Sequence, residues 1–144
     1  MDYFSAMDIS ATGLDLERTR LDLIALNIAN ATTTNSNPNN VYRPLNVIAS
    51  PKAASFETQL DGQLKQLPYS GVEITSIDYS RSEPRKVLSP GHPHADKDGF
   101  VFSPDINLTV EMLDLISARR GYEANLKVIS AAKTMNERAL EIGK

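Results

Sequence analysis

The last forty residues, from Asp105 to Lys144, contain no proline and only two glycines, Gly121 and Gly143. Apolar side chains recur there every three, four or seven residues, which places them along one side of an α-helix; they are Leu108, Met112, Leu115, Tyr122, Leu126 and Ile129. A helix from Asn107 to Ile142, capped by Asp105 or Asn107, would be roughly 54 Å long at about 1.5 Å per residue. A chain of 144 residues has no compact core of that depth. This helix must therefore pack along a partner.

The apolar face of this helix moves round its axis, because a second apolar row overlaps the first. The second row comprises Val128, Ala132, Met135, Ala139 and Ile142. Such a shift is expected when a straight helix runs beside more than one neighbour. The pattern therefore predicts contacts on several sides of the helix.

A second long helix is predicted at the other end of the chain, from Phe4 to Asn30. Its apolar residues repeat at intervals of seven, as in the seam of a coiled coil; they are Met7, Leu14, Leu21 and Ile28, with Leu16, Leu23 and Ile24 widening the face. Gly13 and Gly121 each weaken their helix by about 1 kcal/mol relative to alanine. We therefore expect both helices to form against partners. An ordinary intramolecular helical hairpin fits the periodicity equally well.

The middle of the chain predicts a small β-rich insert. Strands are expected at Val41–Ser50, where Pro44 suits only an edge strand, and at Gly71–Tyr79, with a bulge at Thr75–Ser76. Short strands are expected at Lys86–Leu88 and Phe100–Phe102, while residues 51–70 are interpreted as a loop. The organisation expected is thus a discontinuous helical domain, 1–33 with 105–144, around an insert of residues 34–104.

Composition excludes several classes of function. No stretch of 18 apolar residues exists, so no membrane insertion is expected, and residues 1–5 lack the features of a cleaved secretory signal. Cysteine is absent, and a net charge of −3 does not favour nucleic acid as a partner. No nucleophile elbow, phosphate loop or dinucleotide fingerprint occurs. We therefore expect no enzyme, no catalytic residue and no cofactor.

One cluster raises the question of a metal site: His92, His94, Asp96 and Asp98. Imidazole and carboxylate groups are plausible ligands of zinc or manganese. All four residues nevertheless lie within one loop that contains prolines and glycines, where such residues usually form turns. No second cluster in the sequence would complete a site. The loop interpretation is favoured, and no metal is expected.

Both ends of the chain resemble the bacterial flagellar rod and hook proteins. The N-terminal resemblance rests on Ser10-Ala11-Thr12-Gly13-Leu14, Arg18 and residues 25–33. The C-terminal resemblance rests on Glu111-Met112, Ser117-Ala118-Arg119, Tyr122-Glu123-Ala124-Asn125, Lys133, Met135 and residues 139–143. Within that family the middle segment, with Pro90-Gly91-His92-Pro93, Ala95-Asp96, Gly99-Phe100-Val101 and Pro104, is similar to the short proximal rod members. The chain departs from the family at His94, where an aspartate is usual, in the asparagine-rich loop after Asn30, and at residues 104–107.

The resemblance implies an α+β fold whose terminal helices pair as a coiled coil of the flagellar axial D0 type. It implies a structural subunit of the proximal rod, polymerising into the drive shaft that transmits motor torque. The implied partners are copies of itself and other rod proteins, with the MS ring and the export gate as further contacts. It also implies a location in the periplasmic rod of the basal body, reached by flagellar type III export without a cleaved signal.

The assembly interface is expected on the apolar rows of both helices and on polar residues beside them. The candidates are Met7, Leu14, Leu21, Ile28, Asn27, Asn30, Met112, Leu115, Arg119, Tyr122, Asn125, Leu126, Ile129 and Met135. Asn27 and Asn30 either bond across helices or cap the end of their own helix. Two alternatives stay open: a soluble coiled-coil adaptor or chaperone that binds partner helices, and a metal-dependent enzyme that uses His92 and His94.

Overall fold

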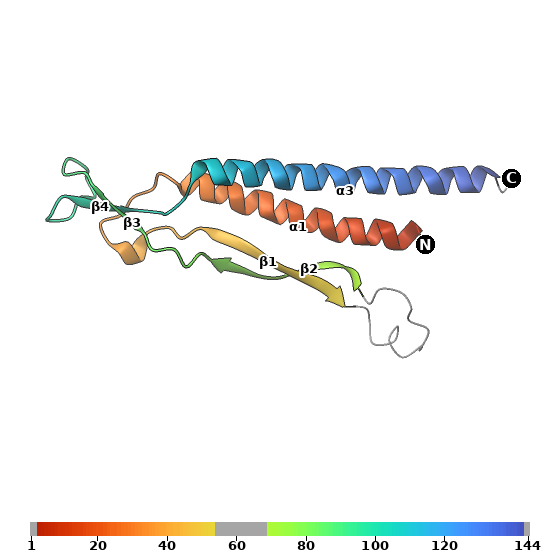
Figure 1. Cartoon of the computed structure of the whole chain (residues 1–144), viewed down its shortest axis with the longest axis horizontal. Helices are drawn as coiled ribbons and strands as arrows, with labels where there is room; N and C mark the ends of the chain where they lie inside the picture. The colour runs from red at the N-terminus through yellow and green to blue at the C-terminus, as the bar shows by residue number, and fades with distance from the viewer. Residues whose placement is uncertain (1–2, 54–68, 143–144) are drawn as a thin grey trace.

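A computed structural model describes residues 3–53 and 69–142, which form an α+β fold with a long helix at each end (Figure 1). Helix α1 spans Tyr3–Asn30, and helix α3 spans Leu108–Ile142. The elements between them are the short 3-10 helix η1 (Pro38–Asn40) and the strands β1 (Leu45–Ala53), β2 (Tyr69–Tyr79), β3 (Arg85–Leu88) and β4 (Phe100–Ser103). The expected α+β class is confirmed, and both helices match their expected bounds closely.

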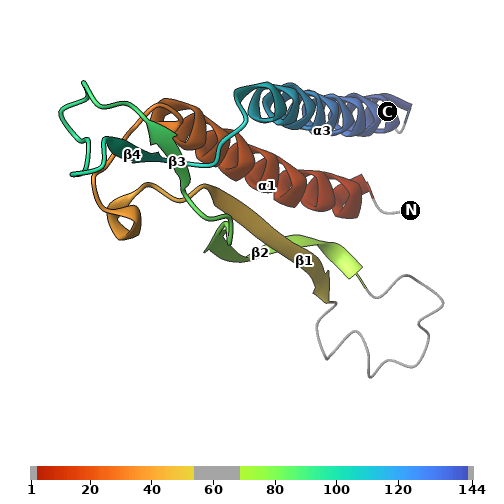
Figure 2. The same cartoon turned by 60° about the vertical axis from the view of Figure 1, so that its left-hand side comes forward.

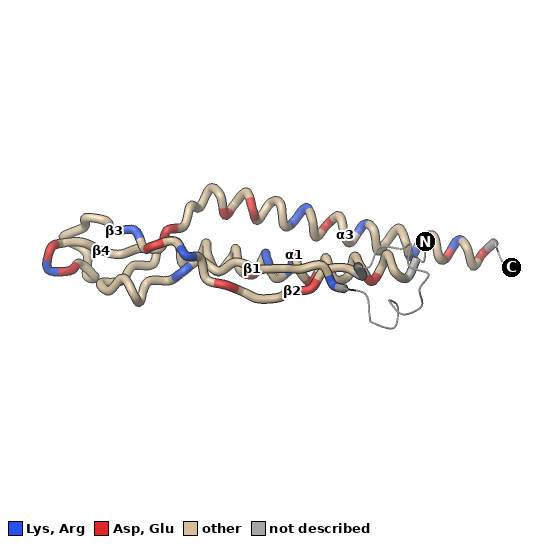
Figure 3. The backbone as a smooth tube through the Cα atoms, turned by 60° about the horizontal axis from the view of Figure 1, so that its bottom comes forward, with Lys and Arg blue, Asp and Glu red and all other residues tan. Residues whose placement is uncertain are grey.

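The two long helices lie side by side and run in opposite directions, with α1 as a middle layer between α3 and the β1–β2 sheet (Figures 1 and 2). Asn27 contacts Glu111 near one end of the pair, and Gly13 lies against Asn125 further along it. Because α3 has 35 residues and α1 has 28, α3 extends past the start of α1. Residues 3 and 142 therefore lie toward the same end of the molecule (Figure 3). In the described part of the chain, neither helix combines the length and apolarity needed to cross a membrane.

The two helix glycines allow α1 and α3 to approach each other. A Cβ atom on Gly13 would lie 2.8 Å from Asn125 Nδ2, and one on Gly121 would lie 3.1 Å from Glu17 Cδ. Each glycine thus faces a side chain of the opposite helix. From the sequence, both glycines were expected only to weaken their helices, and this packing role was not predicted.

The apolar core is small and its phase on α1 differs from the expected seam. The buried apolar residues are Leu16, Leu23, Val41, Val101, Ile106, Ala118 and Ala132. Leu16 and Leu23, which were expected to flank the seam, are the best-covered leucines of α1, whereas Met7, Leu14, Leu21 and Ile28 are half-buried. The reason is that α1 packs on two sides, against α3 and against the sheet. Its most buried row therefore lies between the two contacts.

The strands form two antiparallel pairs. Strand β1 pairs with β2 from Leu45↔Tyr79 to Ala53↔Tyr69, and Thr75 is the unpaired extra residue because Ile48 pairs with Ser76 and Ala49 with Ile74. This confirms the expected bulge. Strands β3 and β4 form the second pair, close to the expected bounds.

Two strand predictions were wrong in part. The first strand begins at Leu45, after Pro44, instead of at Val41. The reason is that Val41 is the C-cap of η1, and the pairing with β2 begins only at Leu45. Residues 51–53 and 69–70, which were interpreted as loop, belong to β1 and β2. The rest of that predicted loop, residues 54–68, lies outside the described residues.

The β1–β2 sheet is attached to α1 through Thr12 and Gly71. The backbone N–H of Val72 donates to Thr12 Oγ1 at 3.1 Å. Gly71 has φ +114°, and a Cβ atom there would collide with the Thr12 side chain. Only glycine satisfies both conditions. The strands are thus fixed to the helix, while the division of the chain into a helical domain and an insert stays a prediction.

Candidate assembly interface

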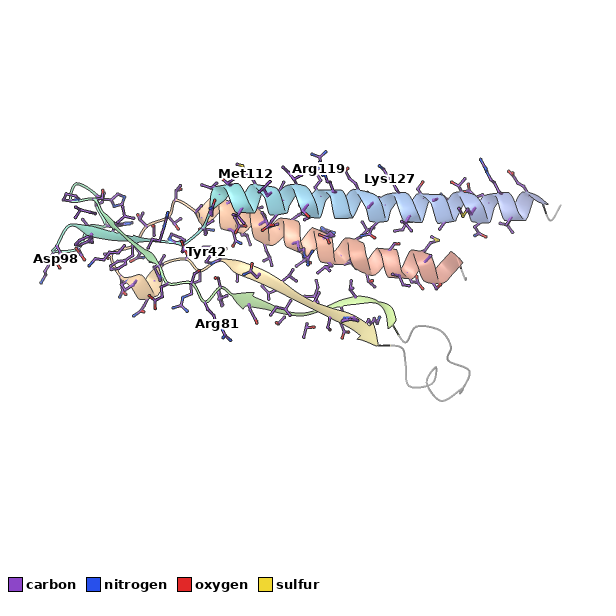
Figure 4. The ribbon with its side chains drawn as sticks, in the orientation of Figure 1. Tyr42, Arg81, Asp98, Met112, Arg119 and Lys127 are labelled. Carbon is purple, nitrogen blue, oxygen red and sulfur yellow. The ribbon has the colours of Figure 1, made fainter. Side chains whose placement is uncertain are left out.

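Asn27 is the polar centre of the subunit, in the last turn of α1, with 1% of its surface exposed. Its Oδ1 accepts hydrogen bonds from Tyr42 Oη and from the backbone N–H of Leu45, both at 2.9 Å. Its Nδ2 donates to the carbonyl of Leu45 at 3.1 Å and to Glu111 Oε2 at 3.4 Å. One side chain therefore joins α1, the start of β1 and the first turn of α3, and both of its polar atoms are satisfied. Figure 4 labels Tyr42 at this junction.

The start of α3 is held beside Asn27 by its own cap. Asn107 Oδ1 accepts from the backbone N–H groups of Thr109 and Val110, at 3.0 Å and 3.4 Å. This is the capping arrangement expected for one of the two candidate residues. It fixes the first turn, and hence the position of Glu111.

Glu111 and Tyr42 have perturbed acidities at this junction. Burial raises the pKa of the Glu111 carboxyl; the hydrogen bond from Asn27 lowers it, and the nearby Asp114 carboxylate raises it further. Burial also raises the pKa of Tyr42, and Glu111 and Tyr79 add to that effect. Tyr42 therefore stays protonated at neutral pH and can donate to Asn27. Among the described residues, no cation forms a salt bridge with Glu111.

Replacing Glu111 with glutamine is expected to stabilise the protein at neutral pH. The folded-state pKa of Glu111 is raised above its ordinary value of 4.5, so the folded state binds this proton more tightly than the unfolded state. Stability is then lost as pH rises through the raised pKa. Glutamine removes that loss and can still accept from Asn27. Thermal unfolding should show a higher midpoint for Glu111→Gln at neutral pH, and a difference that shrinks as the pH falls below 4.5. A difference independent of pH would contradict the assignment.

The candidate interface residues fall into three groups. Asn27 is buried; Met7, Leu14, Leu21, Ile28, Asn30, Leu115, Tyr122, Asn125 and Ile129 are half-buried; Met112, Arg119, Leu126 and Met135 are exposed. Asn30 donates to the carbonyl of Leu26 within α1, at 2.8 Å. Arg119 pairs with Glu123 within α3, at 2.9 Å. Apart from Asn27, the candidates therefore keep surface that a neighbouring subunit can cover.

The structure adds apolar residues that the sequence argument did not select. On α3, Val110, Leu113 and Ile116 are 50%, 62% and 48% exposed, and on α1 Leu26 is 48% exposed. Figure 4 shows Met112, Arg119 and Lys127 on the side of α3 turned away from α1. A second apolar row on the outer face of α3, at Leu113 and Ile116, is visible in the sequence. This row is shorter than the row that runs from Leu108 to Ile129, so its signal in the sequence is weaker.

The surface of the chain is large for its mass. The exposed area is 10721 Å², whereas a compact monomer of 15.8 kDa exposes about 7300 Å². Both long helices carry large apolar side chains that are exposed, among them Leu26, Leu113 and Met135. Exposed apolar side chains that gather on one surface usually mark an interface.

The loop with His92 and His94 uses its polar groups to fold. The backbone N–H of His94 donates to His92 Nδ1 at 3.1 Å, and His94 Nδ1 donates to the carbonyl of Thr34 at 2.8 Å. Asp96 Oδ1 accepts from the backbone N–H groups of Asp98 and Phe100. Within residues 3–53 and 69–142, no three metal-ligating side chains come together. The contacts of these residues are those of a tight loop.

Two paired terminal helices with uncovered apolar sides define a structural protein that is built into a larger assembly. Residues 97–142 match the family described as flagellar basal body rod FlgEFG protein C-terminal. The chain is 37% identical to the flagellar basal-body rod protein FlgC of Borreliella burgdorferi, over 99% of this chain and 98% of the relative. It is 35% identical to FlgC of Bacillus subtilis over the whole of both chains, and 31% identical to FlgC of Salmonella typhimurium over 99% of both.

The chain belongs to the FlgC family of flagellar basal-body rod proteins. It is a structural subunit of the basal-body rod and not an enzyme. The two alternatives left open by the sequence, the soluble adaptor and the metal-dependent enzyme, are thereby set aside.

Proposed function

We propose that α1 and α3 are the polymerisation elements of this rod subunit, and that the subunit occupies the proximal part of the rod. The observation that carries the proposal is the position of the uncovered apolar side chains, which line both helices over most of their length. Met112 and Met135 on α3 are 54% and 55% exposed, and Ile9 on α1 is 45% exposed. Covering them requires neighbours on several sides.

In the rod, the helices of one subunit pack against those of its neighbours as a coiled-coil layer. The half-buried row Met7, Leu14, Leu21 and Ile28 repeats at intervals of seven residues, the spacing of a coiled-coil seam. The end of α3 that extends past α1 has no partner helix within the described subunit. A neighbouring helix supplies that partner.

A contact between unlike surfaces that does not close into a ring generates a helical filament. Helices packed along the filament resist twisting, because packed interiors deform little. The subunit thus transmits motor torque through its terminal helices. Its partners are copies of itself and other rod proteins, and the MS ring and the export gate at the base of the rod.

The proposed location is the periplasmic rod, reached through the flagellar export apparatus without a cleaved signal. The supporting observation is that α1 is integral to the fold. Ser10, Leu16, Leu23 and Asn27 of α1 are all buried in the subunit. Residues 3–30 therefore remain in the mature subunit.

Hydrogen exchange of the dilute monomer and of assembled basal bodies tests polymerisation through the helices. In the monomer, amides near Asn27 and Glu111 should be protected, because side-chain bonds hold that end together. Amides at residues 3–9 and 133–142 should exchange at least tenfold faster, since fewer contacts of the subunit hold them. Assembly should protect both ends. Fast exchange that persists at both helix ends in assembled basal bodies would overturn the proposal and point to the strands as the assembly surface.

A further inference from the structure

Helix α1 carries a row of unpaired acidic residues. Asp8, Asp15 and Asp22 recur at intervals of seven residues, and all three are exposed. Within the described part of the chain, none of their carboxylates forms a salt bridge or a side-chain hydrogen bond. Leu26, which is 48% exposed, lies one turn beyond Asp22 on the same side of the helix.

Helix α3 carries a matching row of unpaired basic residues. Arg120 and Lys127 are seven residues apart and exposed, and neither pairs with another described residue. By contrast, Arg119 pairs with Glu123, and Lys133 pairs with Glu137. Ile116, which is 48% exposed, and Leu113, which is 62% exposed, precede Arg120 on the same side.

The basic row lies on the outer side of α3. The acidic row lies on the side of α1 away from α3, about 40–80° round the helix from Thr12, which contacts the sheet, and it stays exposed beside the sheet. At 100° per residue, the aspartates lie about 140–180° round α1 from Gly13 and Glu17, the residues of α1 that face α3. Ala118 and Asn125 lie on the side of α3 that faces α1, and Arg120 and Lys127 lie about 140–180° round α3 from them. Figure 4 shows Lys127 directed away from α1, and Figure 3 shows the charges spaced along both helices. The two rows cannot meet within one subunit.

We propose that the acidic row on α1 of one subunit docks against the basic row on α3 of a second copy, with the two helices antiparallel. Asp22 then faces Arg120, and Asp15 faces Lys127. Both rows have the same spacing, about 10.5 Å for seven residues, so the two ion pairs form in one register. Because the contacting surfaces differ, the contact can repeat from copy to copy, and it builds a filament when the rotation between copies does not close a ring.

The same register also brings together the exposed apolar residues. Counting along antiparallel helices from Asp22 and Arg120, Leu26 meets Ile116, and Ala29 meets Leu113. Burying Leu26 and Ile116 supplies affinity, while the ion pairs select the register, since exposed charges contribute more to specificity than to affinity. The charged residues and the apolar residues of the two helices are thus complementary in the same register. This complementarity indicates that a second copy of the chain binds the acidic row of α1. The inference rests on the proposed polymerisation through the helices and names the surfaces that meet.

Charge reversal tests the pairing in a motile strain that depends on this chain. One variant carries Asp15→Lys and Asp22→Lys, another carries Arg120→Glu and Lys127→Glu, and a third combines all four. Each of the first two should reduce the swimming fraction about tenfold, because like charges then face each other. The combined variant should recover swimming. The control Glu73→Lys with Asp78→Lys makes the same change in net charge as the first variant, on exposed positions of β2, and should swim normally.

Normal swimming of either reversed variant would overturn the pairing, as would failure of the combined variant to recover while its circular dichroism matches that of the unaltered chain. Failure of the unaltered chain to support swimming would instead count against the proposed function. The two failures are therefore distinguishable.

Cross-linking reports the contact directly, because the chain has no cysteine of its own. Asp22→Cys combined with Arg120→Cys, treated with a short bismaleimide in purified basal bodies, should give a ladder of covalent multimers. Each single-cysteine variant should give none. Dimers from Asp22→Cys alone would show that like surfaces meet, and the absence of a ladder from the double variant would show that these surfaces do not meet; either result overturns the proposal.

Discussion

Replacing Asn27 with leucine is expected to lower the free energy of unfolding by about 3–5 kcal/mol. Leucine has nearly the same volume, so little cavity forms. The loss comes from the partners, because Tyr42 Oη and the backbone N–H and carbonyl of Leu45 all bond to Asn27. Each buried polar group left without a partner costs about 1–3 kcal/mol. That sum is a large fraction of the roughly 5–15 kcal/mol that holds an ordinary domain together. Urea unfolding followed by circular dichroism measures it.

A matched control lies one turn further along α1. Asn30 makes a single side-chain bond, to the carbonyl of Leu26 in its own helix, at 2.8 Å. Asn30→Leu should therefore change stability by no more than about 0.5 kcal/mol. If Asn27→Leu and Asn30→Leu lose the same amount, the junction of α1, β1 and α3 does not depend on Asn27.

The helices could be predicted because their signals are local. Apolar spacing, the absence of proline after Asp105 and the cap at Asn107 all act within one or two helical turns. The same holds for the bulge at Thr75, which appears as a slip in an alternating pattern. These features need no knowledge of what lies on the other side of the helix or strand.

The junction at Asn27 could not be predicted in the same way. Its partners Tyr42, Leu45 and Glu111 lie 15, 18 and 84 residues away along the chain. An asparagine near a helix end is equally suited to capping, which is the role that Asn30 has. From the sequence, Asn27 could either bond across helices or cap its own helix. Only the packing of α1, β1 and α3 shows that it bonds across elements.

The phase of the buried row on α1 was missed for a related reason. A seven-residue repeat identifies a row that can be buried, but several rows of one helix can qualify. Leu16 and Leu23 are covered within the subunit, while Leu14 and Leu21 remain half-buried. A helix that serves both its own fold and an assembly divides its apolar residues between the two. Substitutions at Leu21 and Leu16 can therefore distinguish an effect on assembly from an effect on the fold.

Replacing Leu21 with aspartate is expected to abolish swimming while leaving a folded, exported protein. Leu21 is half-buried in the subunit, so a carboxylate there keeps access to water before assembly. Once a neighbour covers the site, the charge must be buried without a partner, which costs several kcal/mol. The substitution should therefore prevent polymerisation of the subunit and leave its folding intact. A swimming assay and the fraction of exported protein give the two measurements.

Two further substitutions serve as controls for Leu21→Asp. Leu21→Met keeps the volume and polarity of the site and should swim normally. Leu16→Asp places the charge at a residue that is 9% exposed within the subunit itself, so it should unfold the subunit as well as stop swimming. Circular dichroism then separates the two aspartate variants: helical signal retained in Leu21→Asp and lost in Leu16→Asp means that Leu21 acts in assembly. Normal swimming of Leu21→Asp would remove this row of α1 from the assembly surface and leave its outer, acidic row as the face that meets the next subunit.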